Sequence, residues 1–205
     1  MSEDAHYGER RETISDALAR LPRLEMAYHI PPGNTPDNYA AQELAGILGQ
    51  GQSSRMYEHL VREKQLASQV NVRADARIGP SLFYVSATAR PGVKAEDLEK
   101  AMDEEIATVA KDGVTADELA KAKTQLLRRF IDQRRSSLNT ANTIGRDAVY
   151  FDDPNLINTV IDKQDAVTLD QVNAVAKKYL VRDQRTVVIT LPAVTGASAP
   201  AAAGQ

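Results

Sequence analysis

Cysteine is absent from the 205-residue chain, which excludes disulfide bonds, thiolate metal sites and cysteine nucleophiles. No apolar run approaches the roughly 20 residues that a membrane-spanning helix needs, so we expect no membrane span. The net charge is −3 and no strongly basic cluster occurs, which argues against a nucleic-acid-binding surface. The N-terminal residues are polar and charged, and we expect no signal peptide among them. With 42% hydrophobic and 26% charged residues, the composition is that of a soluble globular protein.

Histidine is scarce, and its three copies are poorly placed for catalysis. A zinc protease needs two imidazoles on one helix face together with a carboxylate base, as in His-Glu-x-x-His or the inverted His-x-x-Glu-His. No second histidine lies within one helical turn of His59, because arginines occupy positions 55 and 62. His29 is expected on the polar face of a strand, and His6 lies in the N-terminal segment. We therefore predict no metal site in this chain.

The serines and carboxylates offer no better catalytic set. Ser53, Ser54, Ser136 and Ser137 are expected at helix caps and on helix surfaces, and no Gly-x-Ser-x-Gly elbow occurs. Acidic runs at residues 96–97, 103–105 and 152–153 are expected to be solvated faces or a helix stop. We therefore predict no catalytic residue.

A glycine-rich turn, Gly49-Gln-Gly51, precedes the sequence Ser53-Ser-Arg55. Backbone amides at a helix N-terminus are able to hold an anion. The turn lacks the spacing and the lysine of a phosphate-binding loop, so a purely conformational role is the favoured interpretation.

Alternation of apolar and polar residues predicts strands over residues 24–30, 70–76 and 83–89. Gly79-Pro80 indicates a hairpin between the last two, with a loop longer than two residues. Residues 186–191 are almost continuously apolar, and we expect a final strand that is buried on both faces.

Helical periodicity and capping residues predict the helices. Asp37 or Asn38 is expected to cap a helix that runs to about Leu48, and Ser53 or Ser54 to cap the next one. Further helices are expected over residues 95–112, from the capping box at 115–118, over 138–151, over 156–161 and from a second capping box at 168–171.

This order of elements predicts an α+β fold, a two-layer sandwich of one mainly antiparallel or mixed sheet with helices packed on one face. We expect the last strand to return to the sheet formed by the first three. Residues 1–10 are predicted to be a flexible N-terminal segment, and residues 11–192 one α+β domain without a metal motif. Residues 193–205, rich in alanine, glycine and proline, are predicted to be a disordered tail.

Several segments follow one another in an order that is informative: Leu21-Pro-Arg-Leu-Glu-Met-Ala-Tyr-His-Ile-Pro31, Leu48-Gly-Gln-Gly-Gln-Ser-Ser-Arg-Met-Tyr57, Leu60-Val-Arg-Glu-Lys-Gln-Leu-Ala67 and Val114-Thr-Ala-Asp-Glu-Leu-Ala-Lys-Ala-Lys123. They resemble the entry strand, the turn into a helix, the run into the next strand and a later helix start of one domain type. That domain is the second, non-metal-binding domain of pitrilysin/insulinase-type zinc metallopeptidases, which include the processing peptidases. The resemblance covers the chain from about Arg10 to Pro192.

The resemblance implies a metallopeptidase half-domain that closes over a substrate but holds no metal itself. Zinc is expected in the parent protein or a partner, and peptide or unfolded protein as the substrate. The expected partners are an upstream metal-binding domain and a homologous partner chain. The parent protein would be a zinc metalloendopeptidase, whereas this segment alone is predicted to be inactive. Bacterial relatives are often exported, which favours the periplasm over the cytoplasm.

Many active members of the family carry an arginine and a tyrosine, seven residues apart, that contact the substrate. Aligned on Leu66-Ala67, the matching positions here hold Val61 and Ser68, and Arg62 is followed seven residues on by Gln69. The resemblance therefore transfers no substrate-binding residue. A domain without this pair fits the metal-bearing polypeptide of a two-chain enzyme. The alternative is a catalytically inactive scaffold or assembly subunit of the same family.

Overall fold

The computed structural model describes residues 8–193 of the chain. Its elements follow in the order β1 (Arg10–Asp16), β2 (Arg23–Ile30), α1 (Pro36–Gly49), the π-helix η1 (Tyr57–Glu63), β3 (Ala67–Ala74), β4 (Ser81–Ala89), α2 (Ala95–Asp112), α3 (Ala116–Arg134), α4 (Ser137–Phe151), α5 (Leu156–Asp165), α6 (Leu169–Tyr179), the 3-10 helix η2 (Arg182–Gln184) and β5 (Arg185–Pro192). Residues 1–7 of the predicted flexible segment lie outside the described residues. Apart from Ala193, so does the predicted tail.

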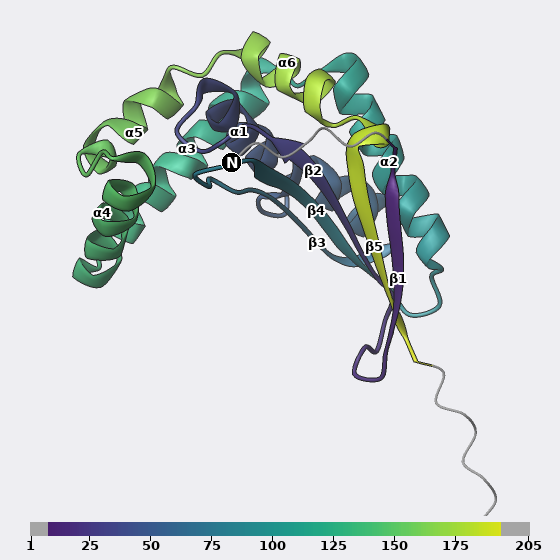
Figure 1. Ribbon diagram of the computed structural model, residues 1–205. Coiled ribbons are helices and arrows are strands. Elements are labelled where there is room, and N and C mark those ends of the chain that lie inside the picture. Colours follow the sequence, from purple (N-terminus) through teal and green to yellow (C-terminus); the bar gives the residue numbers. More distant parts are fainter. Residues whose placement is uncertain (1–7, 194–205) are drawn as a thin grey trace, which may run out of the picture.

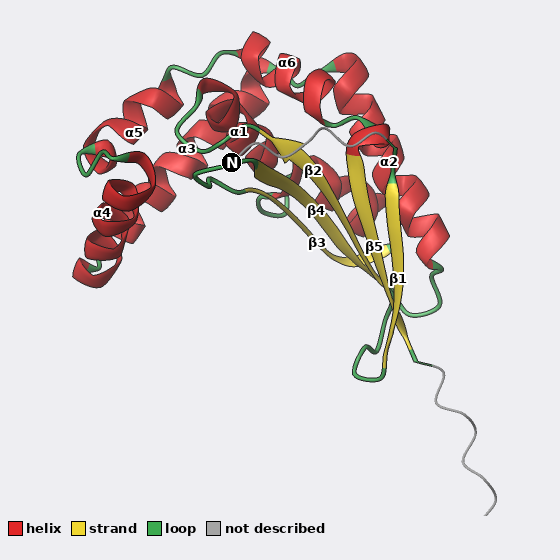
Figure 2. Cartoon of the chain, in the orientation of Figure 1, coloured by secondary structure: helices red, strands yellow, loops and turns green. Residues whose placement is uncertain are grey.

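The five strands form one mixed sheet in the order β1-β5-β2-β4-β3. β1 and β5 are parallel, and the other neighbouring strands are antiparallel. Figures 1 and 2 show the helices as an arch over one face of the sheet, from α4 and α5 at one end to α2 at the other. The predicted α+β sandwich is confirmed, and β5 returns to the sheet beside β2 as expected.

The central strands form where alternate residues are apolar. Leu24, Met26 and Tyr28 of β2 are at most 1% exposed, and they face the helices. On β4, Val85 lies opposite Met26 and Phe83 lies opposite Tyr28, so these side chains continue the same buried layer. This layer is the floor of the hydrophobic core, because the period of two puts one face of each strand against the helices.

The start of α1 differs from the prediction. Thr35, not Asp37 or Asn38, is the N-cap, and its side-chain oxygen accepts a hydrogen bond from the Asn38 N–H at 3.4 Å. Pro36 follows at the first helical position, where its fixed φ suits the helix and its missing N–H costs nothing. The side chain of Asn38 instead donates to backbone carbonyls outside the helix.

The two predicted capping boxes are confirmed. Thr115 starts α3 and exchanges hydrogen bonds with Glu118, and Thr168 starts α6 and exchanges them with Gln171. The helix over residues 95–112 also has its predicted bounds, and it ends at Gly113 with φ of 78°. Among the described residues, no helix has both the length and the apolar content to cross a lipid bilayer.

Strand β1 is the element that the sequence patterns did not predict. Its first six residues are exposed and the last, Asp16, is half-buried, so it has no alternation of buried and exposed positions. Its backbone pairs with β5, from Arg10 opposite Thr186 to Asp16 opposite Pro192. Arg10, which the sequence placed in the flexible segment, is therefore the first residue of a strand.

Strand β5 is not buried on both faces as predicted. Val187 is fully buried, whereas the neighbouring Val188 is partly exposed. β5 lies between β1 and β2, and the helices of the described chain cover only one face there. A run of apolar residues thus marks a central position in the sheet here rather than burial on both sides.

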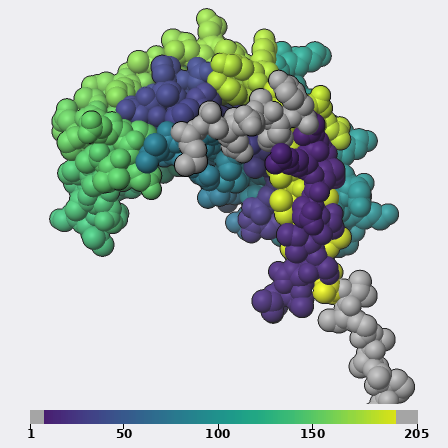
Figure 3. All heavy atoms as spheres, in the orientation of Figure 1, coloured from purple at the N-terminus to yellow at the C-terminus, as the bar shows by residue number. Residues whose placement is uncertain are grey.

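The face of the sheet away from the helices carries polar and partly exposed side chains. Arg23 and Glu25 of β2 have side chains that are 53% and 42% exposed. On the neighbouring strands, the guanidinium of Arg73 lies over the ring of Tyr84, 4.3 Å from its centre. Figure 3 shows the surface hollowed between the green α4 region and the strands β1 and β5. The helices of the described chain leave this face of the sheet uncovered.

Candidate functional site

The glycine-rich turn after α1 serves the packing of α1 against β3. A Cβ atom at Gly49 would lie 2.5 Å from the Cβ of Val72, which is closer than side-chain atoms approach. Gly51 has φ of 78°, a conformation that favours glycine. The hydroxyl of Ser54 donates to the Gly51 carbonyl at 2.8 Å and closes the turn. Both glycines thus have a conformational reason to be there, which agrees with the interpretation favoured by the sequence.

Arg55 fastens this turn to the start of α3. Its Nε and one terminal nitrogen donate to the two carboxylate oxygens of Glu118, at 2.6 and 2.8 Å. Glu118 also accepts a hydrogen bond from the Thr115 N–H at 2.7 Å. These bonds, with that from Arg55 the strongest, lower the pKa of Glu118 to about 2. The guanidinium next to the turn is therefore engaged by this carboxylate rather than turned toward an anion.

The π-helix η1 holds one of the two positions at which family members carry the substrate-contacting pair. Val61 lies in this helix and is 7% exposed. Ser68 lies at the start of β3, is exposed, and donates to a backbone carbonyl of β4 at 3.2 Å. Arg62 points outward and pairs with Glu58 at 2.7 Å. That this site lacks the family's substrate contacts stays a prediction, now with these positions defined.

The histidines that the structure describes do not lie together in one site. The Nδ1 of His59 lies 2.7 Å from Oε2 of Glu105, and its Nε2 lies 3.9 Å from Glu63. His29 is on the uncovered face of the sheet, and His6 is outside the described residues. Within residues 8–193, no group of three histidine, aspartate or glutamate side chains is arranged to hold a metal ion. The described residues therefore do not fit the zinc that the resemblance implies for the parent protein.

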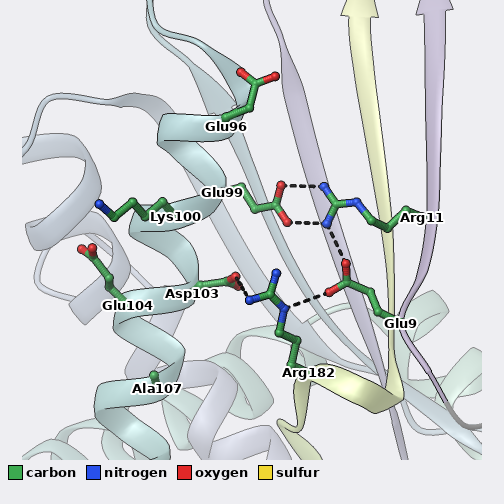
Figure 4. A pocket seen from close by; sticks show the side chains of 9 residues that line it. All are labelled: Glu9, Arg11, Glu96, Glu99, Lys100, Asp103, Glu104, Ala107 and Arg182. Atoms are coloured by element: carbon green, nitrogen blue, oxygen red, sulfur yellow. Dashed lines mark hydrogen bonds and ion pairs between the residues drawn. The ribbon is translucent and has the colours of Figure 1, made fainter.

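A charged cleft of about 670 Å³ lies between β1, α2 and the turn before β5 (Figure 4). Arg11 donates to both carboxylate oxygens of Glu99, at 2.6 and 2.8 Å, and to Glu9 at 2.7 Å. The hydrogen bonds from Arg11 lower the pKa of Glu99. Arg182 lies 3.3 Å from Glu9 and 4.0 Å from Asp103. The carboxylates at the centre of the cleft are thus already paired.

Arg185 completes this network and is only 1% exposed. Its guanidinium donates to Asp103, to Glu9 at 2.8 Å, and to Glu99 and the Tyr28 hydroxyl at 3.4 Å each. Because a buried guanidinium is costly unless it is paired, these groups hold one another in place. The cluster ties β1 and β5 to α2.

Two carboxylates in the acidic run of α2 are not the solvated residues that the sequence predicted. Asp103 accepts hydrogen bonds from the buried Arg185, and Glu105 is 6% exposed and contacts His59. Their partners lie 82 and 46 residues away in the chain. A local pattern of charges contains no signal of such distant pairing, so the sequence could not have identified these contacts.

Comparison with known proteins identifies a protein family that matches this chain. A family model described as the peptidase M16 inactive domain matches residues 2–126. The zinc protease PqqE of Helicobacter pylori is 29% identical over 192 residues, which cover 94% of this chain and 43% of that protein.

Solved structures agree with that match. A protease from Helicobacter pylori has a TM-score of 0.85 and 26% identity, covering 94% of this chain and 46% of that one. The inactive peptidase domain of a putative zinc protease from Bordetella parapertussis has the same fold, with a TM-score of 0.77 and 24% identity, covering 86% of this chain and 95% of that one. The chain thus spans less than half the length of the Helicobacter proteins that it matches, but nearly all of the isolated Bordetella domain.

Proposed function

Because this chain belongs to the peptidase M16 inactive-domain family, we propose that it is the C-terminal, non-catalytic domain of a zinc metallopeptidase. In this proposal the domain encloses a peptide or unfolded protein. It positions that substrate for hydrolysis by a zinc site on an upstream domain or a partner chain. The parent protein is then a zinc metalloendopeptidase, and this segment alone is inactive.

The observation that carries the proposal is the partial match to a zinc protease. The chain spans 43% of the Helicobacter relative, which leaves room in that relative for another domain of similar size. Within residues 8–193 no side-chain group is arranged to hold a metal ion. A catalytic zinc would therefore have to be held outside the described residues.

The uncovered face of the sheet supports a role in enclosing the substrate. The hollow in Figure 3 offers a concave wall, and β1 and β3 are the two edge strands of the sheet. An extended peptide is able to add to such an edge through backbone hydrogen bonds. Holding the peptide in one orientation accelerates a reaction without contributing any reacting group. Confinement and positioning are thus sufficient roles for a domain of this shape.

The proposal is tested by measuring peptide cleavage by the complete parent polypeptide and by a version without this domain. We expect chelator-sensitive cleavage by the complete protein, and a loss of kcat/KM of more than about 100-fold without the domain, because positioning supplies several kcal/mol. Adding the purified 205-residue chain back should restore part of the activity.

Two results would overturn the proposal. Unchanged kcat/KM after removal of the domain would show that it does not position the substrate. A complete parent protein that cleaves no peptide, with zinc supplied, would favour the scaffold or assembly subunit.

A further inference from the structure

Helix α1 carries a carboxylate that the fold leaves unpaired. Glu43 is 1% exposed, and neither of its side-chain oxygens has a hydrogen-bond partner among the described residues. Buried carboxylates are normally paired or hydrogen-bonded, because removing the charge from water is costly. Glu43 is therefore either a defect of the packing or one half of an interaction whose other half is not in the described chain.

Glu43 lines a cleft of about 450 Å³ between α1, α3 and α5. The walls are mainly apolar, with Leu126 and Phe130 from α3 and Ile161 from α5. Glu43 thus lines a cavity that is large enough for a long side chain and has apolar surface for its aliphatic part, and in the structure as it stands the carboxylate oxygens are covered beneath it.

A second unsatisfied acceptor lies in the same cleft. Gln164 of α5 is 4% exposed, and its Oε1 has no hydrogen-bond partner among the described residues. Its Nε2 already donates to Gln42 at 3.0 Å, which fixes the orientation of the amide. The three buried oxygens without a partner, two from Glu43 and one from Gln164, are therefore acceptors, and a ligand that satisfies them must bring several donors.

The charges around the cleft also favour a cation. Lys123 on α3 is directed to Asp165, whose backbone carbonyl accepts its hydrogen bond, and Asp162 stands on the rim. Burial raises the pKa of Glu43 to about 7. The attraction of Lys123 and Arg129 opposes this rise, and the repulsion of Asp165 adds to it. The two nearby cations therefore do not compensate the carboxylate, and its charged form lacks a counter-ion.

Among the described residues, no basic side chain donates a hydrogen bond to Glu43, although Lys123 and Arg129 are near enough to attract its charge. No group of three metal-ligating side chains occurs in the part of the chain that the structure describes. The remaining residues, 1–7 and 194–205, contain no lysine or arginine. At the mouth of the cleft, Leu127 is 42% exposed, and Ile131 one turn further along α3 is 53% exposed. A partner that covers them would be apolar around its cation.

We propose that the cleft between α1, α3 and α5 binds a lysine or arginine side chain of another polypeptide, with Glu43 as its counter-ion and Gln164 as a second acceptor. The aliphatic part of that side chain packs against Leu126 and Phe130, and its apolar neighbours cover Leu127. This inference does not depend on the parent protein being a peptidase.

The test is the binding of three short peptides to the purified chain at pH 8, followed by NMR of the Gln164 side-chain amide. The probes are acetyl-Leu-Arg-Leu-amide, the same peptide with lysine, and the same peptide with citrulline, which has nearly the shape of arginine without its charge. We expect the two cationic peptides to shift the Gln164 amide signals, and the citrulline peptide to bind at least about ten-fold more weakly, since hydrogen bonds to charged groups are the stronger ones.

Two variants distinguish a specific contribution of the buried carboxylate to binding from non-specific electrostatic attraction of the cationic peptide. Glu43→Gln should weaken the binding of the arginine peptide by about ten-fold or more, because it removes the counter-ion and retains the shape of the side chain. Asp162→Asn removes one charge from the exposed rim of the same cleft and should change the affinity by less than about three-fold.

The affinity of the cationic peptides should also fall between pH 8 and pH 5.5, because Glu43 gains a proton over this range; the charged groups that face it are Lys123, Arg129 and Asp165, with Asp162 on the rim. Equal binding of the arginine and citrulline peptides would overturn the proposal. So would an unchanged affinity in the folded Glu43→Gln variant, or no binding of either cationic peptide.

Discussion

The guanidinium of Arg55 and the carboxylate of Glu118 form two parallel hydrogen bonds of 2.6 and 2.8 Å, which join the glycine-rich turn to the first turn of α3. The two residues are 63 positions apart in the sequence. This pair thus fixes a tertiary contact at a helix start that is already stabilised by its own capping box.

Breaking this pair should make stability depend less on pH. The pKa of Glu118 is lowered to about 2 from 4.5, so its contribution is fully present above pH 4.5 and is lost as the pH falls toward 2. We expect Arg55→Met to lower the free energy of unfolding by about 1–2 kcal/mol at pH 7 and by much less near pH 2. Urea unfolding at both pH values measures this, and an equal loss at both would contradict the ion-pair explanation.

Glu43 should have the opposite pH dependence. Its pKa is raised from 4.5 to about 7, so the folded state retains a proton that the unfolded state releases between these values. The contribution of Glu43 to the free energy of unfolding is therefore most favourable below pH 4.5. It falls as the pH rises through 7, by up to about 3 kcal/mol. Glu43→Gln should be more stable than the original chain at pH 8 and similar to it at pH 4.5.

Urea unfolding of both proteins across this range measures the effect, with Asp162→Asn as the exposed control. A Glu43→Gln variant that is less stable at pH 8 would mean that the carboxylate makes a favourable contact within the chain.

The buried guanidinium of Arg185 should be essential to the fold. Arg185→Met leaves Glu9, Glu99 and Asp103 without their central partner, and we expect a loss of about 3–5 kcal/mol, since breaking a buried ion network leaves uncompensated charge. The side chain of Arg182 is 67% exposed in the same cleft, so Arg182→Ala should cost less than about 1 kcal/mol. Thermal unfolding of the two variants makes the comparison, and similar losses would show that burial does not decide the effect.

Two glycine substitutions should change stability in opposite directions. Gly49→Ala puts a Cβ 2.5 Å from the Cβ of Val72 and should cost about 1–3 kcal/mol, because α1 and β3 must separate. Gly145 lies in α4, and a Cβ there meets no atom within 4 Å, so Gly145→Ala should stabilise by about 0.5–1 kcal/mol. Guanidinium unfolding distinguishes them, and a neutral Gly49→Ala would show that the close approach is not required.

The parts of the fold that could be predicted are those that depend on short, local sequence patterns. The alternation over β2 predicts its buried face, and the capping boxes at Thr115 and Thr168 predict the starts of α3 and α6. The family resemblance was likewise carried by local segments, and the match to the peptidase M16 inactive domain confirms it. At the start of α1 the local signal is Thr35-Pro36, which the expectation of a cap at Asp37 or Asn38 overlooks.

The remaining features depend on contacts between distant segments. β1 has almost no buried residue and is defined by its pairing with β5, more than 170 positions away in the chain. Glu43 is a polar residue on a helix, a pattern that usually indicates a solvated face, and only the packing of α3 and α5 over it removes it from water. Periodicity alone therefore could not identify the cleft or the ion network around Arg185.

The central claim is that this domain contributes walls and contacts to peptide hydrolysis but no catalytic group. The most direct measurement is zinc content and peptide cleavage by the purified 205-residue chain after incubation with zinc, removal of unbound metal and separation from contaminating proteases. We expect no stoichiometric zinc in the chain and no cleavage above that of buffer. Tightly bound zinc together with chelator-sensitive cleavage by the chain itself would contradict it.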